Sequence, residues 1–181
     1  MIGLDHVIIE LTMYYSDGFS EQDVKTTVAI SSRAVTDLLA AYWFDVDHND
    51  GAGAHLLFTE SGVLQFESAE FVGRSAIEKV YRDRATRGPR VSRHVLSNVH
   101  LRPVTRRTVD VTSVLTLYAE DGLVPRPRTI PVAIADVHDR LVSTRRGLLI
   151  QCRRTENQFV SADAYFAVPI AADMQSEKWK S

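Results

Sequence analysis

The chain changes character at Gly88-Pro89, where a helical pattern gives way to long segments typical of β-strands. Four such segments follow, all rich in Val, Leu, Ile and Thr, at residues 91–104, 108–119, 130–143 and 147–156. The turn sequences EDG and TRRG separate members of this series. Helices followed by consecutive strands are typical of an α+β domain, in which the helices pack on one face of a curved sheet.

The helical part begins at Ser20, where SEQD offers an N-cap serine followed by acidic residues in the first turn. Apolar residues then recur at the three-and-four spacing of a buried stripe, at Val24, Val28, Val35, Leu38, Leu39, Tyr42, Trp43 and Val46. This pattern predicts either one long helix or two helices broken near ISS, ending around DHNDG. Further along we expect a short helix at AHLLF, a short strand at GVLQF and a helix over residues 73–88.

Length and composition indicate an ordinary globular protein with a single core. With 181 residues, 45% hydrophobic residues and a formal net charge of -2, the whole chain fits one domain. We place its core at about 20–160, with extensions at both ends. The arginine clusters contain interspersed acids and no alternating aromatic residues, so we interpret them as solvated faces and expect no nucleic-acid partner.

Several other classes of protein are disfavoured by missing motifs. The single Cys152 forms no internal disulfide, and the histidines and acids lack metal-site spacing, so we expect no metal and no cofactor. The N-terminal stretch MIGLDHVIIELTMYY is interrupted by charged residues and too short to span a bilayer. We therefore expect a cytoplasmic protein that does not bind membranes.

Four stretches, in this order, resemble the SnoaL-like, nuclear-transport-factor-two-like superfamily. They are AAYWFDVDHNDGAGAHLLFTESGVLQF, FVGRSAIEKVY, RHVLSNVHL and VHDRLVSTRRGLLIQCRR, and the resemblance covers roughly residues 31–156. It implies a cone-shaped barrel in which a strongly bent mixed sheet packs on the N-terminal helices and leaves an apolar pocket open at one end. Members include polyketide cyclases, scytalone dehydratase, epoxide hydrolases, dioxygenase β-subunits and proteins without catalysis, so the fold alone does not settle activity.

The resemblance implies that Asp47 and His94 form an acid/base pair. Asp47 falls where dehydratase-type members keep a pocket carboxylate, and His94 falls at the position of their general-acid/base histidine. A histidine can exchange a proton near neutral pH, and a carboxylate can orient it and hold its charge. The alternative is a histidine that is merely satisfied inside the fold. Tyr42 is assigned to the same catalytic set, where it would steady a substrate oxygen.

Four further residues are expected to contact substrate. Period-two alternation places Asn98 on the same face as His94, provided that no bulge intervenes. In VHDRL, neighbouring residues point to opposite faces, and we favour His138 over Asp139 as the one that faces the pocket. Phe66 stands where scytalone dehydratase carries a pocket tyrosine, and Trp43 belongs to the apolar helix stripe. Ala119 replaces a second pocket histidine, so scytalone dehydration itself is not expected.

Two functions of different class remain open at this point. The first is a cofactor-free lyase, isomerase or cyclase acting by acid/base catalysis on a small, apolar, oxygenated molecule. The second is a non-catalytic ligand-binding or assembly module, similar to the dioxygenase β-subunits. In either case the resemblance implies a homodimer. The proline-rich loop EDGLVPRPRTIP is either a simple hairpin connection or a cover over the pocket mouth, and the first of these is favoured.

Overall fold

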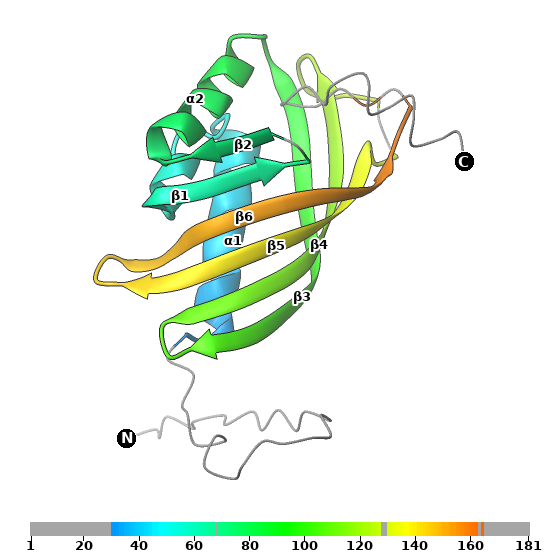
Figure 1. Cartoon of the computed structure of the whole chain (residues 1–181). Helices are drawn as coiled ribbons and strands as arrows, with labels where there is room; N and C mark the ends of the chain where they lie inside the picture. The colour runs from blue at the N-terminus through cyan, green and yellow to red at the C-terminus, as the bar shows by residue number, and fades with distance from the viewer. Residues whose placement is uncertain (1–29, 68, 128–129, 163, 165–181) are drawn as a thin grey trace, which may run out of the picture.

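The computed structural model describes residues 30–67, 69–127, 130–162 and 164. Within these ranges the chain forms two α-helices, a short 3-10 helix and a six-stranded sheet (Figure 1). The proposed helix start at Ser20 and most of both predicted extensions lie outside the described residues.

Helix α1 runs from Ser32 to His48, so it begins within the ISS sequence, and the part of the predicted helical stretch before residue 30 lies outside the described residues. The Ser31 hydroxyl caps the helix by accepting a hydrogen bond from the backbone N–H of Ala34 at 3.2 Å. The predicted apolar stripe is buried, through Val35, Leu38, Leu39, Tyr42 and Trp43. After the helix, Asp50 and Gly51 adopt positive φ values of 53° and 74°, which turn the chain back toward the sheet.

Four short elements follow α1. The 3-10 helix η1 (Ala54–Leu57) and strand β1 (Phe58–Phe66) correspond to the helix and strand predicted at AHLLF and GVLQF. Strand β2 (Ala69–Val72) was not predicted, because its four residues are too few to establish an alternating pattern. Helix α2 (Arg74–Ala85) lies within the predicted helical range.

The remaining strands are long and follow one another closely. They are β3 (Arg90–Thr105), β4 (Thr108–Asp121), β5 (Ala133–Thr144) and β6 (Gly147–Val160). The sheet order is β2-β1-β6-β5-β4-β3, and only the β1–β6 pair is parallel. In Figure 1 the strands bend around α1 as an open, cone-like wrap. The predicted α+β class is therefore confirmed, with a mixed sheet that is curved but not closed.

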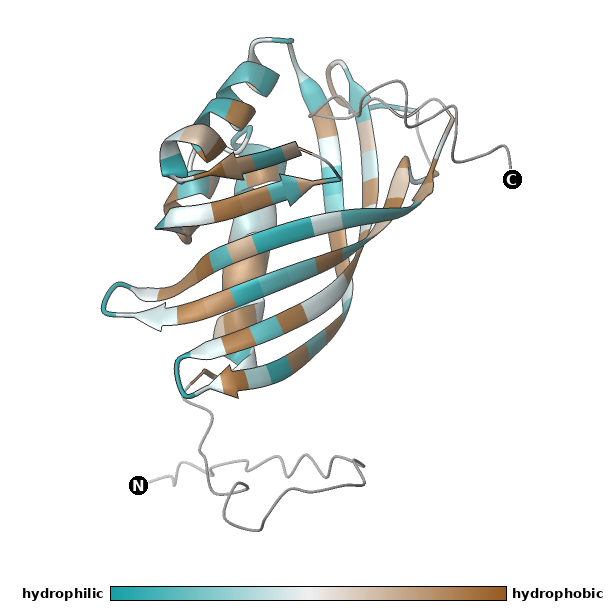
Figure 2. Cartoon of the chain, in the orientation of Figure 1, coloured by the Kyte–Doolittle hydropathy of each residue, from teal (hydrophilic) through white to brown (hydrophobic). Residues whose placement is uncertain are grey.

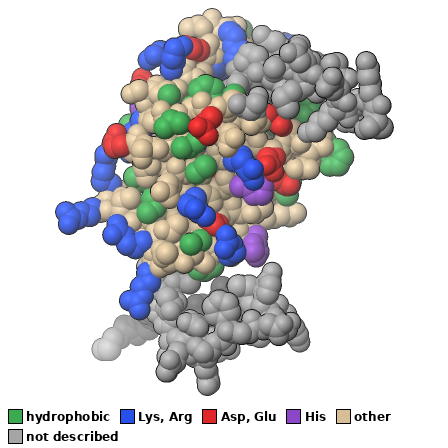
Figure 3. Space-filling model, in the orientation of Figure 1, with side chains coloured by type: hydrophobic (Ala, Val, Ile, Leu, Met, Phe, Trp, Pro, Cys, Tyr) green, Lys and Arg blue, Asp and Glu red, His purple; other side chains and the backbone are tan. Residues whose placement is uncertain are grey.

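Alternation along the strands separates an apolar inner face from a polar outer face, visible as banding in Figure 2. The inner face packs on α1 and forms one hydrophobic core. The outer face carries ion pairs instead: Arg140 to Asp110 at 2.7 Å and Arg154 to Glu156 at 2.8 Å. Charged side chains gather on this surface in Figure 3.

The core contains a fully buried ion pair between β5 and β6. Arg153 donates from Nε and Nη2 to the two carboxylate oxygens of Asp139, at 2.7 and 2.9 Å, and neither side chain is exposed. Burial disfavours the charge on Arg153, but Asp139 outweighs it and raises the pKa of the guanidinium. The guanidinium also lies over the Tyr42 ring, 4.0 Å from its centroid.

This ion pair corrects the expectation that His138 faces the pocket. In β5 the odd-numbered positions are buried, so Asp139 points inward. His138 points to the outer face, where its Nε2 lies 3.4 Å from a carboxylate oxygen of Glu156. Ile130 has the same parity as His138, but it is exposed and precedes β5, so this apolar residue does not mark the buried face of the strand.

The buried pair should dominate the response of the core to mutation. We expect Asp139→Ala to lower the free energy of unfolding by about 3–5 kcal/mol, because it leaves the Arg153 charge buried without a partner. Replacing both residues, as Asp139→Leu with Arg153→Met, should recover most of that loss. Urea unfolding followed by circular dichroism measures both, with exposed Arg102→Ala as the control. A double variant less stable than Asp139→Ala would contradict this account.

Candidate active-site pocket

A cavity of about 130 Å³ lies between the helices and the inner face of the sheet. Cavities of roughly this size accept a ring-sized apolar molecule. Its apolar wall is formed by Trp43 and Val46 of α1, Phe66 of β1, and side chains from β4 and β5. The predicted placement of Trp43 and Phe66 at a pocket agrees with this wall.

Strand β3 supplies the polar side of the cavity through alternate residues. Arg90, Ser92 and His94 all line it, as expected for positions that share one face of a strand. His94 therefore turns inward. The parity of the strand continues only as far as Ser97, where the pairing with β4 becomes irregular.

The carboxylate of Asp47 accepts three hydrogen bonds from β3. They come from the Ser92 hydroxyl at 2.7 Å, the backbone N–H of His94 at 2.8 Å and the His94 Nδ1 at 2.6 Å. Because an ionised carboxylate only accepts, Nδ1 carries the hydrogen and Nε2 of a neutral ring keeps its lone pair. The side chains of Asp47 and His94 are 6% and 13% exposed. The predicted contact between the two is present.

Asp47 is held in its ionised form by these contacts. Burial works against ionisation, but the hydrogen bonds and charge of His94, with the Ser92 hydroxyl, outweigh it and lower the pKa of Asp47 below its ordinary value. An acid near the C-terminal end of α1 is opposed by the helix dipole. Its position is explained by what it binds on β3, and not by helix stability.

Trp43 holds the face of the His94 ring by stacking on it. The two rings stack with centroids 4.3 Å apart and planes 13° from parallel. The Arg153 guanidinium lies 5.0 Å from the centroid of the Trp43 ring. The buried ion pair therefore packs against Trp43, which in turn packs against His94. The edge of the imidazole is thus held by Asp47 and its face by Trp43.

Tyr81 of α2 brings a phenol to the cavity wall, whereas Tyr42 lies beneath it. The two hydroxyl groups are hydrogen-bonded to each other, and Tyr42 has no exposed surface. Burial, as the largest cause, raises the pKa of both phenols, so they stay protonated at neutral pH. Tyr42 therefore supports the wall. Tyr81 shares one face of α2 with the buried residues Ile77 and Val80, and such an apolar pattern in the sequence does not distinguish core from cavity.

The expectation that Asn98 shares the face of His94 is wrong, because a bulge does intervene. The β3–β4 register shifts between Ser97 and His100, and Asn98 adopts a positive φ of 49°. Its side chain is exposed, as is His100. Asparagine is one of the few residues that tolerate this backbone conformation, which accounts for it here without a ligand.

Two of the arginines assigned to solvated faces instead line the cavity. Arg84 of α2 is buried, and Arg90 opens β3 with only a small part of its side chain exposed. Asp45, near the end of α1, accepts a hydrogen bond from the backbone N–H of Gly53 at 2.9 Å and so caps the turn that follows the helix. Burial raises the pKa of the Cys152 thiol, which does not favour a nucleophile.

Two features are absent from the described residues. No cluster of three or more His, Cys, Asp or Glu side chains there is arranged to hold a metal ion. Nor does any helix in the same ranges combine the length and apolar character needed to cross a membrane.

Comparison with known families places these features in context. The sequence model of the SnoaL-like domain matches residues 28–154, which is more than half of the chain. The chain belongs to the SnoaL-like family. This SnoaL-like protein matches none of the curated proteins significantly.

Solved structures share its fold at low sequence identity. A putative scytalone dehydratase from Novosphingobium aromaticivorans is 18% identical, with a TM-score of 0.64, covering 77% of this chain and 92% of that one. ActVI-ORFA from Streptomyces coelicolor is 22% identical, with a TM-score of 0.60, covering 70% and 96%. A cystatin-like protein of unknown function from Nostoc punctiforme is 19% identical, with a TM-score of 0.59, covering 70% and 90%.

The depressed pKa of Asp47 predicts a pH-dependent contribution to stability. At pH 7 we expect Asp47→Asn to lower the free energy of unfolding by about 2 kcal/mol, because hydrogen bonds to a charged group are lost. A carboxyl whose folded pKa is below its ordinary 3.8 stabilises the fold above that pH and loses this effect as the pH falls through the folded value.

The difference between wild type and Asp47→Asn should therefore shrink only below pH 3.8, as measured by denaturant unfolding across a pH series. Asp37→Asn, an exposed change on the same helix, provides the control. A constant difference through the acid range would show that Asp47 is not held ionised by its contacts.

Proposed function

We propose that this SnoaL-like protein is a cofactor-free enzyme that moves a proton at a carbon next to a carbonyl in an apolar, oxygenated small molecule. The single observation that carries this is the Asp47–His94 contact at 2.6 Å on the wall of an apolar cavity. The reaction class is that of an isomerase, cyclase or lyase whose first step is such a proton transfer.

In the proposed mechanism, Nε2 of His94 takes the proton from the substrate carbon. Asp47 holds the Nδ1 hydrogen and stabilises the imidazolium as it forms, while Trp43 keeps the ring in plane. The electron pair moves to the carbonyl oxygen, where a neutral phenol such as Tyr81 can donate to the enolate. His94 then returns the proton to another atom of the substrate, which regenerates the free base.

Several observations support an enzyme over a non-catalytic module. The cavity is open rather than filled by its aromatic side chains, and the histidine in its wall has a defined tautomer. One similar fold carries the name of a putative scytalone dehydratase. Phe66 and Ala119 stand where scytalone dehydratase carries a tyrosine and a histidine, and this difference favours the alternative, a binding or assembly module. Deuterium exchange distinguishes the two functions.

We also propose that the protein is a homodimer in the cytoplasm. Edge strand β3 exposes the apolar side chains of Val95, Val99 and Val104, which a second copy would cover. The ion pairs on the outer sheet face would border such a contact.

Light scattering should give twice the 20.3 kDa of one chain at micromolar concentration. Val95→Glu should shift the mass toward that of one chain, because it places a charge in the apolar contact. Thr112→Glu, an exposed change on the neighbouring strand, is the control. A wild-type mass of one chain would contradict the proposal.

Proton transfer can be tested without the natural substrate. We expect the wild-type protein to accelerate deuterium exchange next to the carbonyl of α-tetralone in D₂O, followed by proton NMR. His94→Ala should lower the protein-dependent rate by at least about 100-fold, because the base is removed. Asp47→Asn should lower it less, since the base remains but its tautomer is no longer held.

The matched control is His100→Ala, which removes an exposed histidine on the same strand. It should leave the rate unchanged. A rate that survives His94→Ala, or wild-type binding of α-tetralone with no exchange above buffer, would favour the non-catalytic module.

A further inference from the structure

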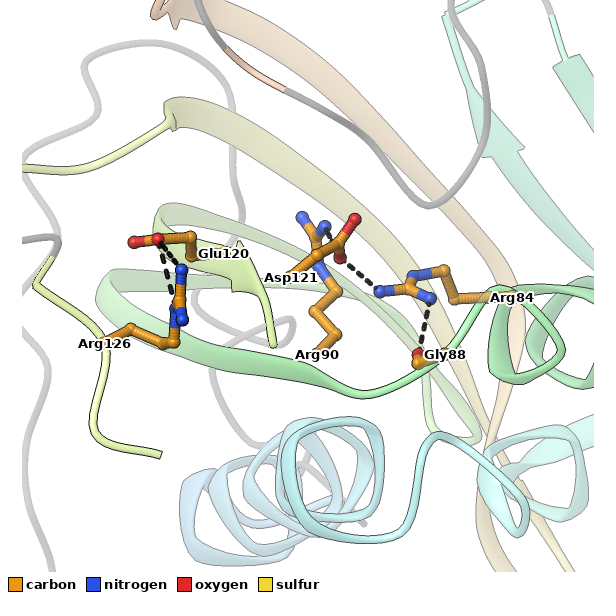
Figure 4. A network of polar contacts seen from close by, with 6 residues as sticks. All are labelled: Arg84, Gly88, Arg90, Glu120, Asp121 and Arg126. Atoms are coloured by element: carbon orange, nitrogen blue, oxygen red, sulfur yellow. Dashed lines mark hydrogen bonds and ion pairs between the residues drawn. The ribbon is translucent and has the colours of Figure 1, made fainter. Parts of the chain in front are cut away.

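One end of the pocket is built around two guanidinium groups that the proposed mechanism does not use. Arg84, from the last turn of α2, and Arg90, the first residue of β3, both line the cavity. Their side chains are only 8% and 11% exposed. Figure 4 shows both side chains converging on Asp121 at the end of β4.

The two cations share one oxygen of a single carboxylate. Arg84 Nη2 and Arg90 Nη1 donate to Oδ1 of Asp121, at 2.6 and 2.9 Å. Arg84 also donates from Nη1 to the carbonyl of Gly88 at 3.2 Å, and its Nε–H has no hydrogen-bond partner among the described residues. A buried guanidinium with an unused donor is costly, because water no longer satisfies it.

Among the described residues, the other acids near Arg84 are bound elsewhere or exposed. Glu120, next to Asp121 in sequence, is bound by Arg126, with Nε at 3.1 Å (Figure 4). Glu67 lines the cavity but accepts the backbone N–H of Asn157 at 3.1 Å, and Asp50 is exposed. Burial, followed by the charge of Arg90, lowers the pKa of Arg84 despite the opposing effects of Asp121 and Asp50.

The arginine end of the pocket lies some distance along β3 from His94, the residue proposed to transfer the proton. Arg90 and His94 lie on the same face, four residues apart, which corresponds to about 13 Å between their Cα atoms. The long arginine side chain reduces the gap but does not close it. An anion held by the arginines therefore lies on a different part of the ligand from the carbon that His94 reaches.

We propose that the pocket binds a ring-containing carboxylic acid, with its carboxylate on Arg84 and Arg90 and a remote carbonyl or phenolic oxygen near His94. This assignment rests on the proposed function and adds the substrate class. A carboxylate matches the planar fork of arginine donors better than a neutral oxygen does. The apolar wall between the two ends, including Phe66 and Leu117, accommodates the rings.

The test compares a carboxylic acid with its primary amide, two probes that share one ring system but differ in charge. Isothermal titration calorimetry of the wild-type protein should show 6-hydroxy-2-naphthoate binding at least about tenfold more tightly than 6-hydroxy-2-naphthamide, since only the acid pairs with the guanidinium groups. Arg84→Gln should remove this preference by weakening the acid alone. Arg84→Lys, which keeps the charge but loses the fork, should retain only part of it.

Further variants distinguish loss of the carboxylate site from misfolding and from loss of the proposed catalysis. Arg90→Gln, at the strand end, is a second variant that should also reduce the preference if Arg84→Gln fails to fold. Arg102→Gln removes an exposed arginine elsewhere on β3 and should change neither affinity. His94→Asn should leave the acid preference intact.

Equal binding of acid and amide by the wild type, or no binding of the acid, would overturn the carboxylate site. So would a preference that persists in both arginine variants. These outcomes are independent of the proposed proton transfer, because α-tetralone is neutral and tests His94 without engaging the arginines.

Discussion

The carboxylate of Asp47 joins the C-terminal end of α1 to the inner face of β3, and the site depends on that junction. Its three hydrogen bonds reach a hydroxyl, a backbone N–H and an imidazole within three residues of one strand. A single side chain therefore fixes the position of the helix end and the tautomer of His94. Under the proposed mechanism, removing it alters stability and proton transfer together, since one set of contacts serves both.

Behind this junction, the ion pair in the core acts as a second layer of support. Asp139 holds Arg153, Arg153 lies against the rings of Tyr42 and Trp43, and Trp43 stacks on His94. Such a pair is seldom the most stabilising choice for a core, because two charges must be desolvated. Its position under the aromatic wall suggests that orientation of the site is what it contributes. Rigid support of this kind allows proton transfer without reorganisation at the moment of reaction.

The pocket has different chemistry at its two ends, although one strand supplies both. Arg90, Ser92 and His94 are alternate residues on one face of β3, and Ser92 donates a hydrogen bond to Asp47. In the functions proposed for this pocket, the arginine end binds a carboxylate, the histidine end exchanges a proton, and the apolar wall between them holds the rings of the ligand. A ligand of matching polarity would be oriented by its own charge before any chemistry takes place. The proposed ligand would give the two buried arginines a role at one end of a cavity whose wall is largely apolar.

The sequence by itself determined the order of elements and the apolar stripe of α1, because these follow from local periodicities of the backbone, whereas the inward placement of His94 rested on the family resemblance. Its resemblance to the SnoaL-like family also paired Asp47 with His94. Only the tertiary structure decided that Asp139 rather than His138 turns inward, and that a bulge removes Asn98 from the face of His94. It likewise decided that Tyr81, Arg84 and Arg90 reach the cavity while Tyr42 lies beneath it. Those outcomes depend on strand register and on how α2 packs against the sheet, which are set by contacts between residues far apart in the chain.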